Sequence, residues 1–436
     1  MKKTVLAVSL ALTTLSGFVL AAGEQFIPIP SYRVGAYASG GAKFYGGMID
    51  YLNYVNMKQG GIGGVKLSYE ECETEYKNDR GVECYERLKG KSGGASAFNF
   101  MSTGITYATM ERADKDKIPL MTMGFGRADA QDGTVFKYVF PLVTSYWSQA
   151  SAKVSFIGQQ LGGMDKLKGK KIVNLYHGSA YGKETIPVLD ALAKKYGFEL
   201  THIEVPAPGT EQQSQWLEIR RAKPDYVLLR SWGVMTPSAL KSAQKVGFPR
   251  EKIVSNWWGG SEEDAVAAGD AAKGYIAGSF AMDGKQFPLI QDIEKTVYGA
   301  GKGNLSDKGY IGTVNYNRGV LSGILMAEAI STAQKKYGAK PLTGDQIRWG
   351  MENLNIDAKR QKELGVSDMF PQIKTSCQNH EGSGYTRFMQ WNGSDWKPVS
   401  GWIKADSSII GPMVKASAQK YAQEKGIAPR NCAAEK

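Results

Sequence analysis

The sequence is poor in the residues and motifs on which many enzymes depend. Its 436 residues include three histidines, His177, His202 and His380, with neither the spacing of a metal-binding pair nor an H-E-x-x-H motif. It contains no G-x-S-x-G nucleophile elbow and no G-x-x-x-x-G-K-[ST] phosphate loop. These absences favour a binding protein without metal or cofactor over an enzyme. A secreted hydrolase that uses His177 stays open as an alternative.

Long apolar runs are also scarce. The one near the start, Val5 to Leu20, follows Lys2 and Lys3 and ends in small residues, which is the pattern of a secretory signal peptide. We expect residues 1–22 to be removed, with the mature chain starting at Ala22 or Gly23. No later run approaches the roughly 20 apolar residues of a membrane helix, and no cysteine stands at the cleavage region for a lipid anchor. We therefore expect a soluble, exported protein.

Cysteine is limited to four residues, and none forms a C-x-x-C pair of the kind found in zinc and redox sites. An even number of cysteines in an exported protein predicts disulfides. Of the three possible pairings we favour Cys72 with Cys84 and Cys377 with Cys432, because each is the more local choice. Each bridge should stabilise the fold by roughly 3 to 4 kcal/mol.

The charge is basic but not concentrated. The formal net charge is +12, or about +10 without Lys2 and Lys3, and basic residues are interleaved with acidic ones along the chain. The densest basic run, KLKGKK at 166–171, stands in a connector before a predicted strand. This distribution is typical of a solvated surface and argues against a nucleic-acid partner.

What the sequence does contain is a regular alternation of short apolar runs and amphipathic stretches, which predicts an α/β fold with doubly wound parallel sheets. In 45–58, for example, apolar residues recur at helical spacing. Strands are predicted at 32–38, 65–72, 95–101, 118–123, 171–177, 198–205, 225–232, 252–258 and 274–282.

The alternation falls into two series, 32 to about 142 and about 171 to 272, and therefore predicts two domains. The stretch 135–147 between them reads as a crossover. A long helix is predicted at 314–336. Near the end, 385–402 reads as a hairpin whose turn is supplied by Asn392 and Gly393.

Several of these stretches occur in a familiar order. YRVGAYASGGAKFYGGMIDYLNYVNMKQGGIGGVKLSYEEC resembles the opening of the type I periplasmic binding proteins of the leucine/isoleucine/valine class. IVNLYHGSAYGKETIPVLDALAKKYGFEL and RRAKPDYVLLRSWGVMTPSALKSAQKVGF are similar to units of the second lobe in that family. The resemblance covers most of residues 32–395.

The resemblance implies two Rossmann-like lobes joined by a hinge of three segments, which capture a small solute and deliver it to the membrane permease of an ABC importer. It places the protein in the periplasm, and we expect a monomer. Lobe 1 would comprise 31–142 and 277–385. Lobe 2 would comprise 143–276 and 386–436, including the C-terminal tail.

The resemblance also implies positions for ligand contacts. Ser102 and Thr103 follow a predicted strand and would hold a carboxylate at the start of a helix, where hydroxyls and free N–H groups suit an anion. The other implied positions lie in the first loop, the loop MTMGFGR and the second lobe: Tyr45, Gly124, Phe125, Gly126, Tyr181, Trp232 and Trp257.

The stretch NWWGGSEED at 256–264 bears on the ligand class. Amino-acid binders of this family place an acid after the corresponding strand to pair with the ligand's ammonium, and Trp257 or Trp258 stands there instead. Glu262 and Glu263 follow closely enough to restore that acid. Because an unpaired buried ammonium is costly, we expect an aromatic carboxylate, with a branched-chain or other amino acid as the alternative. If both tryptophans lay on a strand they would face opposite ways, and we expect Trp257 on the ligand and Trp258 in the core.

Overall fold

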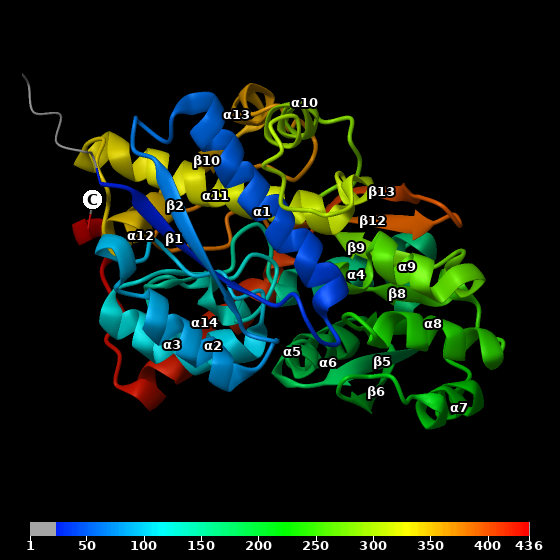
Figure 1. Ribbon diagram of the computed structural model, residues 1–436. Helices are drawn as coiled ribbons and strands as arrows, with labels where there is room; N and C mark the ends of the chain where they lie inside the picture. Colours follow the sequence, from blue (N-terminus) through cyan, green and yellow to red (C-terminus); the bar gives the residue numbers. More distant parts are fainter. Residues whose placement is uncertain (1–22, 436) are drawn as a thin grey trace, which may run out of the picture.

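The computed structural model describes residues 23–435 as two α/β lobes lying side by side (Figure 1). The predicted signal peptide lies outside the described residues. Within the described residues, no helix has the length and apolarity needed to cross a membrane.

The first lobe is built around β1 (Gln25–Ser31), which pairs in parallel with β2 (Leu67–Glu73). The segment 95–101 lies between β1 and β3 (Leu120–Met121), and β3 pairs in parallel with β4 (Val139–Phe140). Helices α1 (Ala38–Gln59) and α11 (Val314–Tyr337) pack against each other on one side, and α2 (Asn78–Leu88) and α3 (Thr103–Asp116) lie on the other. The remaining elements are α10 (Pro288–Ile293), α12 (Gly344–Glu352), α13 (Ala358–Glu363), β10 (Asn355–Ile356) and β11 (Ile373–Lys374).

Two strand predictions in this lobe are wrong. The first strand is QFIPIPS at 25–31, whereas 32–38 forms a turn and the start of α1. Pro28 and Pro30 hid this strand, because proline lacks the N–H that a ladder requires. Segment 95–101 is extended but makes only one bridge, from Phe98 to Leu120.

The second lobe has a seven-stranded sheet in the order β13-β12-β9-β8-β7-β5-β6. Its five parallel strands are β5 (Lys171–Gly178), β6 (Glu199–Pro206), β7 (Tyr226–Arg230), β8 (Ile253–Ser255) and β9 (Ile276–Ser279). The predicted hairpin forms β12 (Tyr385–Trp391) and β13 (Trp396–Lys404), and β12 pairs antiparallel to β9. The strands alternate with α4 (Tyr146–Gln160), α5 (Ala180–Lys183), α6 (Ile186–Tyr196), α7 (Gln213–Ala222), α8 (Met235–Lys245) and α9 (Glu262–Ala268).

The faces of this sheet are buried separately. Ile172, Leu228 and Val254 pack with apolar residues of α4 and α6. Val173, Val227 and Leu229 point the other way, toward α7 and α8. Because neighbouring residues of a strand alternate between faces, the near-continuous apolar runs in the sequence reflect strands covered on both sides.

The C-terminal helix α14 (Ser407–Lys425) crosses from one lobe to the other. Ile410 and Val414 are buried in the second-lobe core, whereas Ala418 and Ala422 are buried against residues of α2, α3 and β3 in the first. Assigning the whole tail to lobe 2 was therefore wrong, because the small side chains in the later turns of α14 fit against the first lobe.

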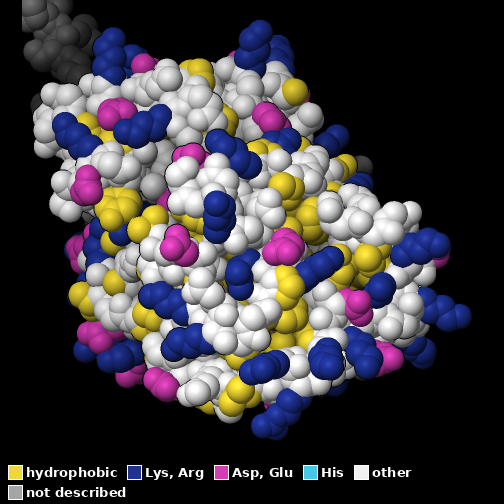
Figure 2. Space-filling model, turned by 90° about the vertical axis from the view of Figure 1, so that its right-hand side faces the viewer, with side chains coloured by type: hydrophobic (Ala, Val, Ile, Leu, Met, Phe, Trp, Pro, Cys, Tyr) yellow, Lys and Arg dark blue, Asp and Glu magenta, His cyan; other side chains and the backbone are white. Residues whose placement is uncertain are grey.

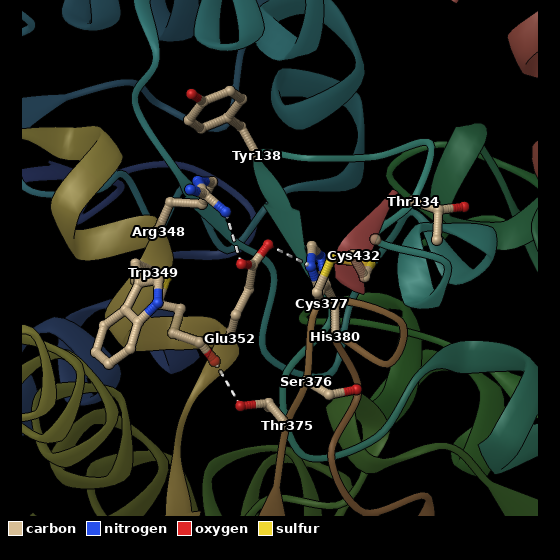
Figure 3. Close-up of polar contacts among 12 residues, drawn as sticks. Thr134, Tyr138, Arg348, Trp349, Glu352, Thr375, Ser376, Cys377, His380 and Cys432 are labelled. Carbon is tan, nitrogen blue, oxygen red and sulfur yellow. Dashed lines mark hydrogen bonds and ion pairs between the residues drawn. A yellow bond between two sulfur atoms is a disulfide. The ribbon is translucent and has the colours of Figure 1, made fainter. Parts of the chain in front are cut away.

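Both predicted disulfides are present, Cys72–Cys84 and Cys377–Cys432. Beside the second bridge, Glu352 accepts hydrogen bonds from Arg348, His380 and Arg430 (Figure 3 shows the first two of these). We call these four residues the anchor cluster. Burial would raise the pKa of Glu352, but the hydrogen bonds and charges of its partners hold that pKa below its usual value. The anchor cluster and the disulfide fix the end of the chain to the first lobe.

The surface in Figure 2 carries Lys and Arg side chains spread among acidic and uncharged ones, with no single basic patch on that face. This distribution agrees with the pattern of charges in the sequence.

Candidate functional site

A small cavity of about 10 Å³ lies where the two lobes meet. Six of its eight lining residues are aromatic, and none of the eight is acidic. First-lobe segments supply Tyr76, Met101, Thr103 and Phe125, and second-lobe segments supply Tyr146, Tyr181, Trp232 and Trp258. The remaining volume is about that of a single water molecule, so the aromatic walls are nearly in contact.

The adjacent tryptophans join the lobes. The prediction that they lie on a strand is wrong, because β8 ends at Ser255 and residues 257–259 form a single helical turn. Both indole N–H groups donate to the Gly124 carbonyl oxygen of the opposite lobe, at 2.6 Å from Trp257 and 3.1 Å from Trp258. Trp258 also contacts the Tyr146 hydroxyl at 2.8 Å.

The turn reverses the expected roles of the pair. Trp258 lines the cavity, whereas Trp257 is fully buried behind it, 5.8 Å from the Tyr146 ring and 5.2 Å from the Phe280 ring between centroids. The expectation that Trp257 is the cavity wall and Trp258 the core residue rested on strand alternation, which does not apply in a helical turn.

The start of α3 forms the first-lobe side of the cavity. The Ser102 hydroxyl accepts from the Ile105 N–H and so caps the helix, while the Thr103 hydroxyl accepts from the Gly126 N–H at 3.3 Å. Tyr76 and Met101 have φ of +61° and +46°, in the left-handed region that non-glycine residues seldom occupy. Such backbone strain costs about 1–3 kcal/mol and concentrates at ligand sites.

The predicted site residues therefore divide into three groups. Thr103, Phe125, Tyr181 and Trp232 line the cavity. Directly behind these lie Ser102, Gly124, Gly126 and Trp257, held by the contacts given above. Tyr45 is in neither group, because it is fully buried in the first-lobe core with its hydroxyl on the Phe100 carbonyl oxygen.

Sequence reasoning missed four lining residues. Met101 immediately precedes the predicted pair Ser102 and Thr103, and Tyr146 lies in the predicted crossover, so the sequence pattern that predicts those segments could have indicated both residues. Trp258 was assigned to the core. For Tyr76, the sequence offers no motif that indicates a binding residue, and only its place in the loop after β2 brings it to the cavity.

The acidic residues after the tryptophans are engaged elsewhere. Both carboxylate oxygens of Glu262 accept from the Val314 N–H at the start of α11, and Glu263 accepts from the Asn315 side chain. Burial raises the pKa of both carboxyls. These contacts cross from lobe 2 to lobe 1, and neither residue is among those that line the cavity.

His177 also bridges the lobes. Its Nε2 atom lies 2.9 Å from the Tyr37 hydroxyl, and its Nδ1 atom lies 2.9 Å from the Ser179 hydroxyl. Burial lowers its pKa to about 4. Both ring nitrogens are thus bonded to hydroxyl groups, without the carboxylate that would orient a catalytic base.

A buried arginine supports the second-lobe wall. The Arg230 guanidinium lies 3.8 Å from the centre of the Tyr146 ring and 4.5 Å from that of Tyr181, and its Nε and Nη2 atoms donate to the Tyr181 carbonyl oxygen. The Tyr181 hydroxyl donates to the Ser231 carbonyl oxygen and accepts from Asn256. This side of the cavity is therefore fixed by hydrogen bonds as well as packing.

Comparison with known proteins identifies this arrangement. The family model described as periplasmic binding protein matches residues 24–395. A solved structure described as an ABC transporter permease from the Pseudomonas fluorescens group is 47% identical, with a TM-score of 0.89 over 94% of this chain and 99% of that one. Curated protein sequences give no match.

Two further structures share the fold at lower identity. A branched-chain amino-acid ABC transporter from Thermus thermophilus with bound valine has 19% identity and a TM-score of 0.76, over 90% of this chain and 99% of that one. A solute-binding protein from R. palustris in complex with benzoate has 18% identity and a TM-score of 0.68, over 88% and 98%.

The match over 24–395 and the two lobes joined around an interlobe cavity lead to one conclusion: the chain belongs to the periplasmic binding protein family, in its type I leucine/isoleucine/valine class of ABC transporter substrate-binding proteins.

Proposed function

We propose that the protein captures a small aromatic carboxylate between its lobes in the periplasm and presents it to the permease subunits of an ABC importer, without chemical change. Residues 1–22 direct its export, and it works as a monomer. The observation that carries the proposal is the composition of the interlobe cavity, which has six aromatic side chains and no acid among its lining residues.

The cavity walls suit a flat apolar ring. Aromatic pairs contribute about 0.5–1.5 kcal/mol each beyond the burial of their surface. With about 10 Å³ left, the rings now occupy the space that a ligand needs, so capture requires the lobes to separate and close again. The solute-binding protein from R. palustris, which has the same fold, binds benzoate.

The polar end of such a ligand has donors nearby. Thr103 lies in the first turn of α3 and on the cavity wall, and a helix N-terminus favours a carboxylate by about 0.3–2 kcal/mol. An α-ammonium would find no counter-charge on the cavity walls, since none of the eight lining residues is acidic. The charge of the site therefore favours an acid over an amino acid.

A thermal-shift screen tests the proposal. Benzoate and hydroxylated benzoates should raise Tm, since a ligand at 100 times its Kd adds about 2.7 kcal/mol of stability. Mass spectrometry of the small molecule released from the purified protein identifies the natural ligand, and recovery of the added acid unchanged excludes turnover. A rise in Tm with valine or leucine and none with benzoates would establish the amino-acid alternative instead.

A further inference from the structure

Two buried cations of the second lobe lack the partners that buried charges require. Lys153 on α4 and Arg230 at the end of β7 are both fully buried. Neither forms an ion pair with a carboxylate of the described residues. The Nζ atom of Lys153 and the Nη1 atom of Arg230 have no hydrogen-bond partner among those residues. Buried charges in folded proteins are otherwise paired or bound to ions.

The two cations belong to one region. Leu228 packs with the α4 side of the sheet, and Arg230, two residues later on the same strand, therefore points to that side as well. Burial, with the positive charge of Arg230 adding to it, lowers the pKa of Lys153 to about 7. One turn earlier on α4, the buried side-chain amide of Gln149 also has no partner.

The acidic groups around this region do not balance it. Burial raises the pKa of the Glu184 carboxyl, and the charge of Arg230 opposes that increase only in small part. The Glu184 oxygens accept from the Tyr107 hydroxyl and the Ala128 N–H. With Lys153 protonated and Glu184 ionised, these three groups leave one positive charge without a counter-charge, and the raised pKa of Glu184 weakens the compensation that this carboxyl gives. The buried Arg318 differs, because three carboxyls, those of Glu262, Glu263 and Asp264, lie near it and oppose the lowering of its pKa by burial.

The region adjoins the interlobe cavity. Arg230 stacks on Tyr146 and Tyr181, both of which line the cavity. Of the three guanidinium nitrogens of Arg230, Nε and Nη2 donate to the Tyr181 carbonyl oxygen, and Nη1 has no hydrogen-bond partner among the described residues. The carboxyl end of a parallel strand is also where ligands bind in doubly wound sheets.

We propose that Lys153 and Arg230 form a buried site for one singly charged anionic group, directly behind the tyrosines of the interlobe cavity. The group is a halide ion or the carboxylate of the captured ligand, and the second source rests on the proposed function. Lys153 Nζ and Arg230 Nη1 donate to the anion, and the Gln149 amide adds a neutral donor. The anion neutralises the positive charge of Lys153 and Arg230 that Glu184 does not balance.

Crystals of the unmodified protein in sodium bromide test the halide source. An anomalous peak is expected within hydrogen-bond distance of Lys153 Nζ and Arg230 Nη1. In parallel, sodium chloride should raise Tm relative to sodium gluconate at equal ionic strength. Lys153→Met should abolish that difference, whereas Lys241→Met, which alters an exposed lysine of the same lobe, should keep it.

Crystals with benzoate and with terephthalate, which has a second carboxylate, test the ligand source. A carboxylate at the same two nitrogens, with bromide displaced, assigns the site to the ligand. If neither bromide nor a bound carboxylate lies there, the proposal is overturned. A bromide peak without any effect of halide on Tm is an adventitious ion only and equally overturns it.

The two proposals fail separately. If no aromatic acid binds at all, the proposed function is wrong and the bromide crystals alone decide the anion site. If Lys153→Met does not fold, the bromide crystals and the chloride–gluconate comparison of the unmodified protein still decide it.

Discussion

The anchor cluster in the first lobe and the Lys153–Arg230 pair in the second are both buried and charged, but their partners differ. In the anchor cluster, Glu352 accepts from Arg348, His380 and Arg430, and the two arginines also pair with Asp345 and Glu435, so each charge is met by another. Lys153 and Arg230 have no carboxylate partner among the described residues, and Arg230 stacks on Tyr146 of the cavity wall. The comparison separates a polar cluster that fixes the chain from one that is completed by something the chain does not supply.

The largest expected effect comes from breaking the anchor cluster. Glu352→Gln should lower the free energy of unfolding by about 3–5 kcal/mol, because it removes the buried carboxylate that Arg348 and Arg430 share and leaves them only the more exposed Asp345 and Glu435 as counter-charges. The pKa of Glu352 lies below its unfolded value, so its contribution is complete above pH 4.5 and is lost as pH falls through the folded pKa. Urea unfolding at several pH values measures the loss of stability in the variant and its pH dependence. A loss of the same size in strong acid would contradict the role of the ionised Glu352 carboxylate.

Lys153→Met should raise the free energy of unfolding, whereas Glu352→Gln lowers it. Removing an unpaired buried charge should stabilise the protein by about 1–4 kcal/mol in halide-free buffer. Because the pKa of Lys153 falls from 10.5 unfolded to about 7 folded, the unfolded chain binds the extra proton between these values, and stability rises with pH across that window. The gain from the variant should therefore be largest below pH 7 and vanish above pH 10.5, as urea unfolding in gluconate buffers can check. A loss of stability throughout would show that the lysine is paired.

The two tryptophans offer a matched pair within the site. Trp258→Ala should weaken benzoate binding by about 1.5–3 kcal/mol, which is 10- to 100-fold in Kd, because this ring lines the cavity. Trp257→Ala should lower Tm more and affinity less, because its ring is packed between Tyr146 and Phe280. Calorimetry and thermal melts on the same samples distinguish them, and the reverse pattern would restore the assignment expected from strand alternation.

The smallest effect is expected at a contact between the lobes. Tyr37→Phe removes the hydroxyl that meets His177 Nε2, a hydrogen bond worth about 0.5–1.5 kcal/mol. Since the bond joins the closed lobes, the variant should release its ligand faster while its urea midpoint hardly changes. Stopped-flow dissociation is the measurement, and an unchanged release rate with a lowered midpoint would make the contact purely structural.

The sequence predicted the fold well where periodicity was strong. The parallel strands of the second lobe, the long helix α11 and the hairpin β12–β13 all formed close to their predicted positions. It failed at β1, because two prolines masked the strand, and at α14, because an amphipathic helix does not reveal that its two halves pack on different lobes.

The site was predicted less completely. Thr103, Phe125, Tyr181 and Trp232, which the family resemblance implied as ligand contacts, line the cavity, and their contact with a ligand stays a prediction. The sequence assigned Trp257 to the cavity and Trp258 to the core, and the structure has the reverse. The reason is a helical turn after β8, which the residues NWWGG do not predict. Arg230 reads in the sequence as one polar residue ending an apolar strand, and its missing partner becomes visible only in three dimensions.

The central claim is that the interlobe cavity accepts an aromatic acid and not an amino acid, and isothermal titration of the ligand-free protein tests it most directly. The protein should first be unfolded and refolded to remove any copurified ligand, and then titrated with benzoate, coumarate, leucine and valine under one set of conditions. The account predicts saturable binding of at least one aromatic acid with a negative heat-capacity change, and no binding of leucine or valine. Tight binding of leucine or valine, with none of the aromatic acids, would contradict it.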